Sequence, residues 1–190
     1  MKVIVLGTGK SLNDFPRELL DKYPSYGSNY IGMAGIQPTY YVCGDHRLLE
    51  DFDGIGETAR KAKIAYFSPV NAKTDPIYSI PHVLLTRDKD AFVKEKSLSG
   101  GTITYSLLKL AYYAGFDTVL LWGVDFDPTW EHFRDDYPCP GNLDRKTDAM
   151  MYHMRLAASV YKEAGKRIIN FSRPSVLDEF IERGVSLERI

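Results

Sequence analysis

Two runs of consecutive apolar residues constrain the fold of this chain most strongly. The first covers residues 3–6, the second covers residues 119–122 of the strand expected at 118–122, and a glycine follows each run. A strand that is apolar at every position is buried on both faces, which is typical of parallel sheets covered by helices. Because strand-like and helix-like segments alternate along the chain, the sequence predicts an α/β fold. We expect a Rossmann-like, doubly wound, mostly parallel sheet with helices on both faces.

The other expected elements follow from the same patterns of apolar residues and of glycine and proline. Further strands are expected at residues 26–31, 39–43, 63–67, 82–86 and 167–171. Helices are expected at residues 15–22, 46–62, 102–114, 147–164 and 176–182. The length of 190 residues fits a single Rossmann-like domain spanning residues 1–190. A long proline-containing loop at about 126–146 is expected to act as a lid.

Charge and cysteine content exclude several classes of protein. The chain has 24 Lys and Arg against 25 Asp and Glu, a net charge of −1, which does not favour a nucleic-acid partner, although a local basic patch is compatible with one. No apolar run reaches the ~18 residues of a membrane span. Two cysteines, Cys43 and Cys139, without a CxxC motif favour a cytoplasmic location. The pair Tyr112-Tyr113 is compatible with a homo-oligomer.

Glycines and polar residues follow several of the predicted strands. Ligands of open parallel sheets bind beyond the carboxyl ends of the strands, so these residues should gather at one edge. The alternative is that they serve only as turn residues. The segments concerned are Gly7-Thr8-Gly9-Lys10-Ser11, Cys43-Gly44-Asp45-His46, Gly123-Val124-Asp125 and Asn170-Phe171-Ser172.

The segment from Gly7 to Ser11 matches neither of two familiar nucleotide motifs. A P-loop would require glycine at position 4, which is Ile4, and a dinucleotide fingerprint would require glycine at position 12, which is Leu12. What remains is a tight strand-to-helix loop. Its backbone N–H groups and the Ser11 hydroxyl can face an anion.

The segment Ser99-Gly100-Gly101-Thr102 precedes the strongest predicted helix. The start of a helix carries roughly half a positive charge, and glycines let a ligand approach the backbone closely. Ser99 or Thr102 could cap the helix or hydrogen-bond a phosphate. An ordinary capped helix without a ligand is the alternative.

Asp125 and His132 are the candidate catalytic residues. Asp125 could act as a base or orient a hydroxyl, or it could simply anchor a loop. His132 titrates near neutrality and is a candidate acid or base. The carboxylates of the long loop form no recognised ligand pattern, so no metal site is predicted. His153 is expected to be a packed residue within a helix.

Several of these motifs, taken in order, resemble the bacterial sialyltransferase family of the Campylobacter type and the related uncharacterised 6-hydroxymethylpterin diphosphokinase-like proteins. The resemblance spans nearly the whole chain in short motifs. They are the GxGxSL loop from Gly7 to Leu12, Ser28-Asn29-Tyr30, Ser99-Gly100, the block at residues 114–126 that contains Gly123-Val124-Asp125, and the tail at residues 161–177.

The resemblance implies a CMP-activated sugar donor and no required metal. It further implies donor contacts from Gly7, Gly9, Ser11, Asn29, Ser99 and Gly100. The sequence departs from the family where Thr8 replaces an asparagine. Asp127 and Phe133 stand where the family has tyrosines, and there is no histidine near residues 143–145, where the family has its catalytic one. His132 is a candidate replacement, and Arg134 or Arg145 could neutralise the leaving phosphate in place of the tyrosines.

The first hypothesis for function is therefore a glycosyltransferase-like transferase that moves a sugar from a nucleotide-activated donor to a hydroxyl acceptor. Thr8, Asn29, Asp45, Gly101 and Thr102 complete the predicted donor site, and no cofactor is firmly implied. One alternative is a pyrophosphokinase that needs Mg²⁺, with Asp45, Asp125, Asp135 or Asp136 as ligands. Another is a nucleotide-binding module without catalytic activity.

Overall fold

The structure is a computed structural model of the chain. It describes residues 1–44, 48, 52–68, 82–84, 86–87, 97–98, 102–126, 131–137 and 147–186. For residues 52–54, 82–84, 86–87, 97–98 and 147 only the backbone is described.

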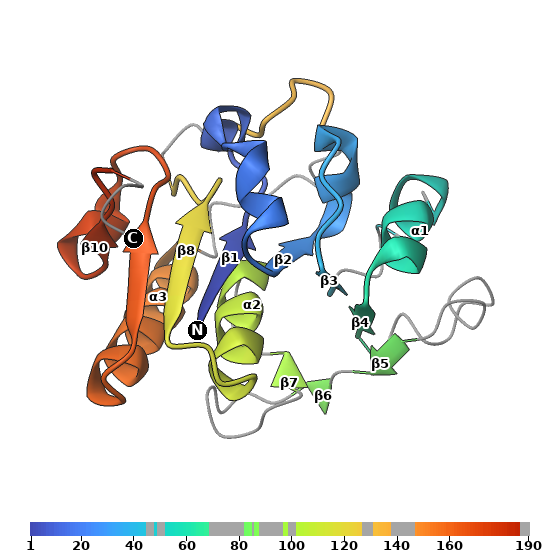
Figure 1. The fold of residues 1–190 in the computed structure, drawn as a ribbon. Helices are drawn as coiled ribbons and strands as arrows, with labels where there is room; N and C mark the ends of the chain where they lie inside the picture. Colours follow the sequence, from blue (N-terminus) through green and yellow to red (C-terminus); the bar gives the residue numbers. More distant parts are fainter. Residues whose placement is uncertain are drawn as a thin grey trace.

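The described residues form an eight-stranded sheet in the order β10-β9-β8-β1-β2-β3-β4-β5, in which every paired neighbour is parallel. Figure 1 shows the strands side by side, from β10 at the left to β5 at the right. The strands are β1 Lys2–Leu6, β2 Ser25–Ser28, β3 Tyr40–Cys43, β4 Ile64–Phe67, β5 His82–Leu84, β8 Thr118–Trp122, β9 Arg167–Asn170 and β10 Glu182–Arg183. A separate parallel pair joins β6 Thr86–Arg87 to β7 Ser97–Leu98.

Helices cover both faces of the sheet, as predicted. One apolar core lies between the sheet and α1 Phe52–Lys61 together with the 3-10 helices η1 Lys10–Asp14, η2 Arg17–Asp21 and η3 Asn29–Ala34. The other lies between the sheet and α2 Ile103–Tyr113 and α3 Thr147–Glu163. Adjacent residues of β1 enter opposite cores, and from Val3 to Leu6 they are 0% exposed. This burial on both faces explains why the strand is apolar throughout.

Several predicted elements differ from the structure. The predicted helix at residues 15–22 is the shorter 3-10 helix Arg17–Asp21. It begins later than predicted because Phe15 precedes a proline and is extended at ψ 123°. The predicted strand at 26–31 ends at Ser28, since Asn29 takes a left-handed φ of 52°. The terminal helix is a 3-10 turn, η8 Val176–Glu179, and β6, β7 and β10 were not predicted.

Only part of the predicted helix at 46–62 is described, and α1 begins at Phe52. No helix within the described ranges combines the length and the apolar character needed to cross a membrane.

Candidate functional site

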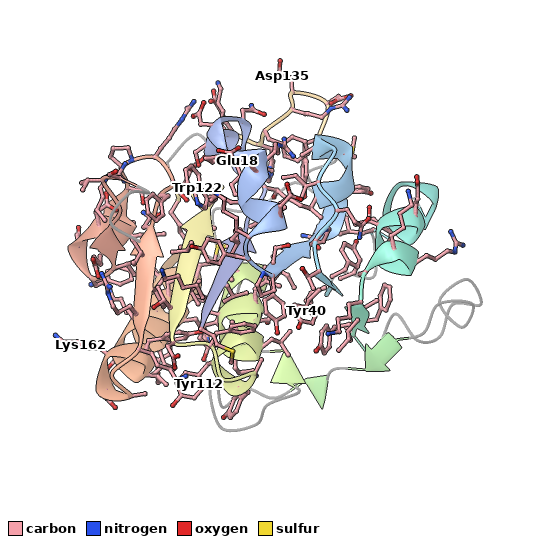
Figure 2. All side chains as sticks on the ribbon, in the orientation of Figure 1. Glu18, Tyr40, Tyr112, Trp122, Asp135 and Lys162 are labelled. Carbon is pink, nitrogen blue, oxygen red and sulfur yellow. The ribbon has the colours of Figure 1, made fainter. Side chains whose placement is uncertain are left out.

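The strand order places the topological switch point between β1 and β8, because the chain moves from β1 toward β5 and later returns to place β8 on the opposite side of β1. Ligands of such sheets bind at the carboxyl ends of the strands beside this point. The backbone N–H of Asp117, just after α2, donates to the carbonyl of Met1 at 2.9 Å. The end of α2 therefore lies at the start of β1, and its first turn lies toward the carboxyl edge. Figure 2 shows Trp122 and Asp135 toward that edge and Tyr112 and Lys162 toward the opposite one.

The loop after β1, residues 7–11 (the β1 loop), packs directly against the loop after β8, residues 123–125 (the β8 loop). The N–H of Gly7 donates to the Trp122 carbonyl at 2.8 Å, and the N–H of Gly9 donates to the Gly123 carbonyl at 2.7 Å. A Cβ on Gly7 would lie 2.3 Å from the Gly123 oxygen, and a Cβ on Gly9 would lie 2.6 Å from Oδ2 of Asp125. Both glycines thus allow the two loops to touch, a role that the strand-loop motif did not reveal.

Asp125 is buried between three segments, with 5% exposure. Its Oδ2 accepts a hydrogen bond from the Ser11 N–H at 2.9 Å, and its Oδ1 accepts one from the Ser11 hydroxyl. Oδ1 also accepts the N–H of Arg173 at 3.3 Å, from the segment after β9. Both polar groups of Ser11 therefore face the carboxylate. Two roles stay predictions: that of Asp125 as a base, and that of Ser11 as a residue that contacts the nucleotide-activated sugar.

His132 lies in a segment, residues 131–137, that packs on the β1 loop. Its Nδ1 is 3.1 Å from the Thr8 carbonyl, and its ring stacks on Tyr137 with centroids 3.9 Å apart. Since a carbonyl only accepts, Nδ1 carries the hydrogen and Nε2 keeps a lone pair. Burial lowers the pKa of His132, and the Thr8 carbonyl partly opposes this shift. The imidazole is therefore neutral at neutral pH.

Further contacts join the same segment to the β1 loop. The Phe133 N–H donates to the Thr8 carbonyl at 3.1 Å, and the Asn13 side-chain N–H donates to the Phe133 carbonyl at 3.0 Å. An ion pair of 2.6 Å links Lys10 to Glu131. The sequence offered no pattern that pairs these residues, because 120 or more positions separate the partners.

Asn29 follows β2, and its backbone and side chain have different surroundings. The hydroxyl of Tyr41 donates to the Asn29 carbonyl at 2.7 Å, and burial raises the pKa of Tyr41 well above its ordinary value, so the phenol stays a donor. Ser28 is 0% exposed. Within the described part of the chain, Ser28 Oγ and Asn29 Oδ1 are buried and have no hydrogen-bond partner.

Nε1 of Trp122, at the end of β8, is also buried and has no hydrogen-bond partner among the residues that the structure describes. The Trp122 ring stacks on Phe171 with centroids 5.2 Å apart and an angle of 7°.

Ser28, Tyr41 and Tyr137 were not among the predicted site residues. Ser28 was named only within the Ser28-Asn29-Tyr30 motif, because the strand expected at 26–31 ran past its position at the end of β2.

The predicted α2 entrance is partly described. Thr102 caps α2, with its hydroxyl accepting the N–H of Thr104 at 3.3 Å. Asp45, Ser99, Gly100 and Gly101 lie outside the described residues. The carboxyl-edge prediction is confirmed for the segments after β1, β8 and β9, which are in contact through Ser11, Asp125 and Arg173, and through a 2.9 Å bond from the Val124 N–H to the Ser172 hydroxyl.

Among the possible metal ligands, Asp136 is paired with Arg134 through two bonds of 2.7 and 2.6 Å. The described residues contain no group of three or more His, Cys, Asp or Glu side chains placed to hold a metal ion. His153 is half-buried, and its ring lies edge-on against Tyr105 with centroids 5.0 Å apart, so the expected packing is met on one side of the ring.

The fold is similar to that of solved bacterial sialyltransferases. The sialyltransferase CstII from Campylobacter jejuni in complex with CMP superposes with a TM-score of 0.62 and 16% identity, over 97% of this chain and 85% of that chain. CstII with CMP-3FNeuAc gives 0.63 and 18%, over 98% and 87%. The monofunctional alpha-2,3-sialyltransferase Cst-I of the same organism gives 0.61 and 15%, over 97% and 80%.

No family model matches the sequence, and neither does any curated protein. At these identities the structural likeness shows the fold alone. It agrees with the sialyltransferase part of the sequence resemblance at that level, and the diphosphokinase-like part stays a prediction.

Proposed function

We propose that this protein is a glycosyltransferase that binds a nucleotide-activated sugar at the carboxyl edge of β1 and β2 and transfers the sugar to a hydroxyl group. The likeness in fold to sialyltransferases solved with CMP or CMP-3FNeuAc supports this choice of donor class. A CMP-activated sialic acid is accordingly the first donor to test.

The observation that carries the proposal is the pair of buried, unpartnered oxygens at the end of β2. Ser28 Oγ and Asn29 Oδ1 have no protein partner within the described residues. Leaving a buried polar group unsatisfied costs about 1–3 kcal/mol, so native structures rarely do so without a reason. Asn29 Oδ1 only accepts, so a ligand that satisfies it donates an N–H or O–H. A nucleoside or sugar supplies such groups, and a fully ionised phosphate does not.

The start of α2 supplies the complementary part of the donor site. Helix N-termini favour anions, and Thr102 already caps this one. We propose that the donor phosphate lies toward this end, with Ser99, Gly100 and Gly101 around it, and with Gly7, Thr8, Gly9 and Ser11 forming the wall on the β1 side. Asp45, which follows β3, is proposed to contact the nucleoside.

His132 is the proposed proton acceptor. In the transfer, the acceptor oxygen forms a bond to the anomeric carbon as that carbon releases the phosphate oxygen of the nucleotide. The acceptor proton moves to Nε2 of His132, whose lone pair is left by the Nδ1 bond to Thr8. Residues 131–137 cover the β1 loop in this arrangement, which supports a lid role for the loop at 126–146.

The test is a binding panel of CMP, UDP, GDP, ADP and ATP, each with Mg²⁺ and with EDTA, read by thermal shift and calorimetry. A nucleotide at about 100 times its Kd should stabilise the protein by ~2.7 kcal/mol. We expect CMP to bind in EDTA, and we expect CMP-sialic acid to be consumed. A response to ATP that requires Mg²⁺ would instead favour the pyrophosphokinase. Binding without turnover of any donor would favour a nucleotide-binding module.

Two variants test the oxygens at the end of β2. Ser28→Ala removes an unsatisfied hydroxyl, so it should leave the free protein as stable or more stable while weakening nucleotide binding. Asn29→Gly keeps access to the left-handed φ of 52° but removes the amide. If both variants bind CMP as the parent does, the proposed position of the nucleoside is wrong.

A further inference from the structure

We propose that Asp125 is a positioning residue, which shapes the β1 loop for binding by holding Ser11 and the segment after β9 in one arrangement. This inference rests on the proposed function for its role in binding. The structural part, that the Asp125 carboxylate orders the β1 loop, stands on contacts within the protein.

The first argument is that donors of the protein occupy most of the Asp125 carboxylate. An ionised carboxylate offers about four lone-pair positions, and three of those on Asp125 receive hydrogen bonds from Ser11 N–H, Ser11 Oγ–H and Arg173 N–H. Only 5% of Asp125 is exposed, so little of its surface is accessible to solvent or to the hydroxyl substrate that receives the sugar. A general base must reach the proton that it removes, whereas a positioning group must be surrounded by donors of the protein.

The second argument is the way in which the β1 loop wraps around this carboxylate. Gly9 lies so close that a Cβ would be 2.6 Å from Oδ2. Gly9 N–H is itself bonded to the Gly123 carbonyl, two residues before Asp125. These contacts fix the turn from Gly9 to Ser11 against the β8 loop, so a movement of the β8 loop would move the turn as well. The Thr8 carbonyl, which holds His132, precedes that turn directly.

The third argument is the connection to the C-terminal part of the chain. Arg173 N–H binds Oδ1 of Asp125, and the neighbouring Ser172 hydroxyl accepts the N–H of Val124 at 2.9 Å. Ser172 and Ser11 are 1% and 2% exposed. Buried carboxylates are stabilised by surrounding donors, so loss of the charge should release the β1 loop on one side and the β9 loop on the other.

The test compares Asp125→Asn and Ser11→Ala with Tyr161→Phe. The last variant removes a buried hydrogen bond of 2.6 Å, from Tyr161 to the Leu108 carbonyl, away from the carboxyl edge. Amide hydrogen exchange of residues 9–12 is measured in the free protein, and the Kd for CMP is measured by calorimetry. We expect Asp125→Asn to speed exchange at these amides and to weaken CMP binding, each by roughly tenfold or more. Tyr161→Phe should change neither.

The double variant of Asp125→Asn and Ser11→Ala distinguishes a shared role from separate ones. The two changes share one contact, the hydrogen bond from the Ser11 hydroxyl to Oδ1 of Asp125. Once Asp125→Asn has disturbed this contact, Ser11→Ala should add little, so the effects on the Kd should be less than additive. Unchanged exchange at residues 9–12 in Asp125→Asn would overturn the inference. So would a lower kcat with unchanged exchange and unchanged CMP affinity, because that pattern indicates a base. If the parent protein binds no nucleotide, the proposed function fails, while the exchange experiment still decides the role of Asp125.

Discussion

His132 joins two segments that are far apart in the sequence. Its Nδ1–H is bonded to the Thr8 carbonyl, and its ring lies against Tyr137 at an interplanar angle of 16°. Neither contact needs a charged imidazole, and burial disfavours one. The neutral ring therefore suits both the packing of the segment and the uptake of a proton.

The pH dependence of this packing follows from the lowered pKa of His132. The unfolded chain, with a histidine pKa near ~6.5, takes up the proton before the folded state does as the pH falls. The stabilising contribution is therefore complete above about pH 6.5 and is lost as the pH falls from there toward the lower folded pKa. An NMR titration of the His132 ring should give a midpoint below the ordinary value. Acidification should also destabilise His132→Gln less than the parent, and a midpoint at or above the ordinary value would contradict this prediction.

At the scale of elements, the loops after β1 and β8 behave as one unit. The backbone N–H groups of Gly7 and Gly9 donate to the carbonyls of Trp122 and Gly123, respectively. The loops approach so closely that neither Gly7 nor Gly9 has room for a side chain. The glycine motif therefore has a structural requirement that is independent of any ligand. Because the two loops are hydrogen-bonded to each other, a ligand that shifts the β1 loop would also shift the β8 loop.

Gly7→Ala tests this unit. The new Cβ would meet the Gly123 oxygen at 2.3 Å, which the backbone must move to relieve. We expect a loss of stability of about 1–3 kcal/mol or more in urea unfolding, as for other overpacked sites. Gly35→Ala is the comparison, since it has a φ of +68° but nothing within 4 Å of the new Cβ. It should report only the cost of the left-handed backbone, and an equal or smaller loss for Gly7→Ala would argue against loop contact as the cause.

At the scale of the whole molecule, the sheet is the partition between two apolar cores. Leu120 belongs to the core beneath η1–η3 and α1, and Leu121 belongs to the core beneath α2 and α3. Both residues are 0% exposed. A half-exposed sheet would bury only one of these two neighbours.

Leu120→Ala and Leu121→Ala should consequently destabilise the protein to a similar extent, each by about 2–5 kcal/mol in urea unfolding. Val185→Ala is a suitable control, because Val185 is 81% exposed and its truncation should cost little. A near-neutral result for either leucine would mean that its face of the sheet is not packed as described.

The sequence alone determined the architecture and the edge at which polar residues collect. Continuous apolar strands such as β1 and β8 require cover on both faces, and parallel strands bring the residues after them to one edge, so Ser11, Asp125 and Ser172 could be predicted to gather there. Local pattern also failed at specific points. The helix expected at residues 15–22 is a 3-10 helix that begins only after Pro16, and the strand expected to end at Ile31 ends at Ser28.

Only the tertiary structure decided what each of these residues contacts. From the sequence alone, Asp125 could be either a catalytic base or a residue that anchors a loop. Its hydrogen bonds come from Ser11 and Arg173, which are 114 and 48 positions away. The sequence likewise gave no sign that His132 contacts Thr8, or that the oxygens of Ser28 and Asn29 find no partner among the described residues. The physical reason is that hydrophobic periodicity is a local property of the chain, whereas the hydrogen bonds of a buried polar group depend on which distant segments the packed sheet brings within 3 Å of it.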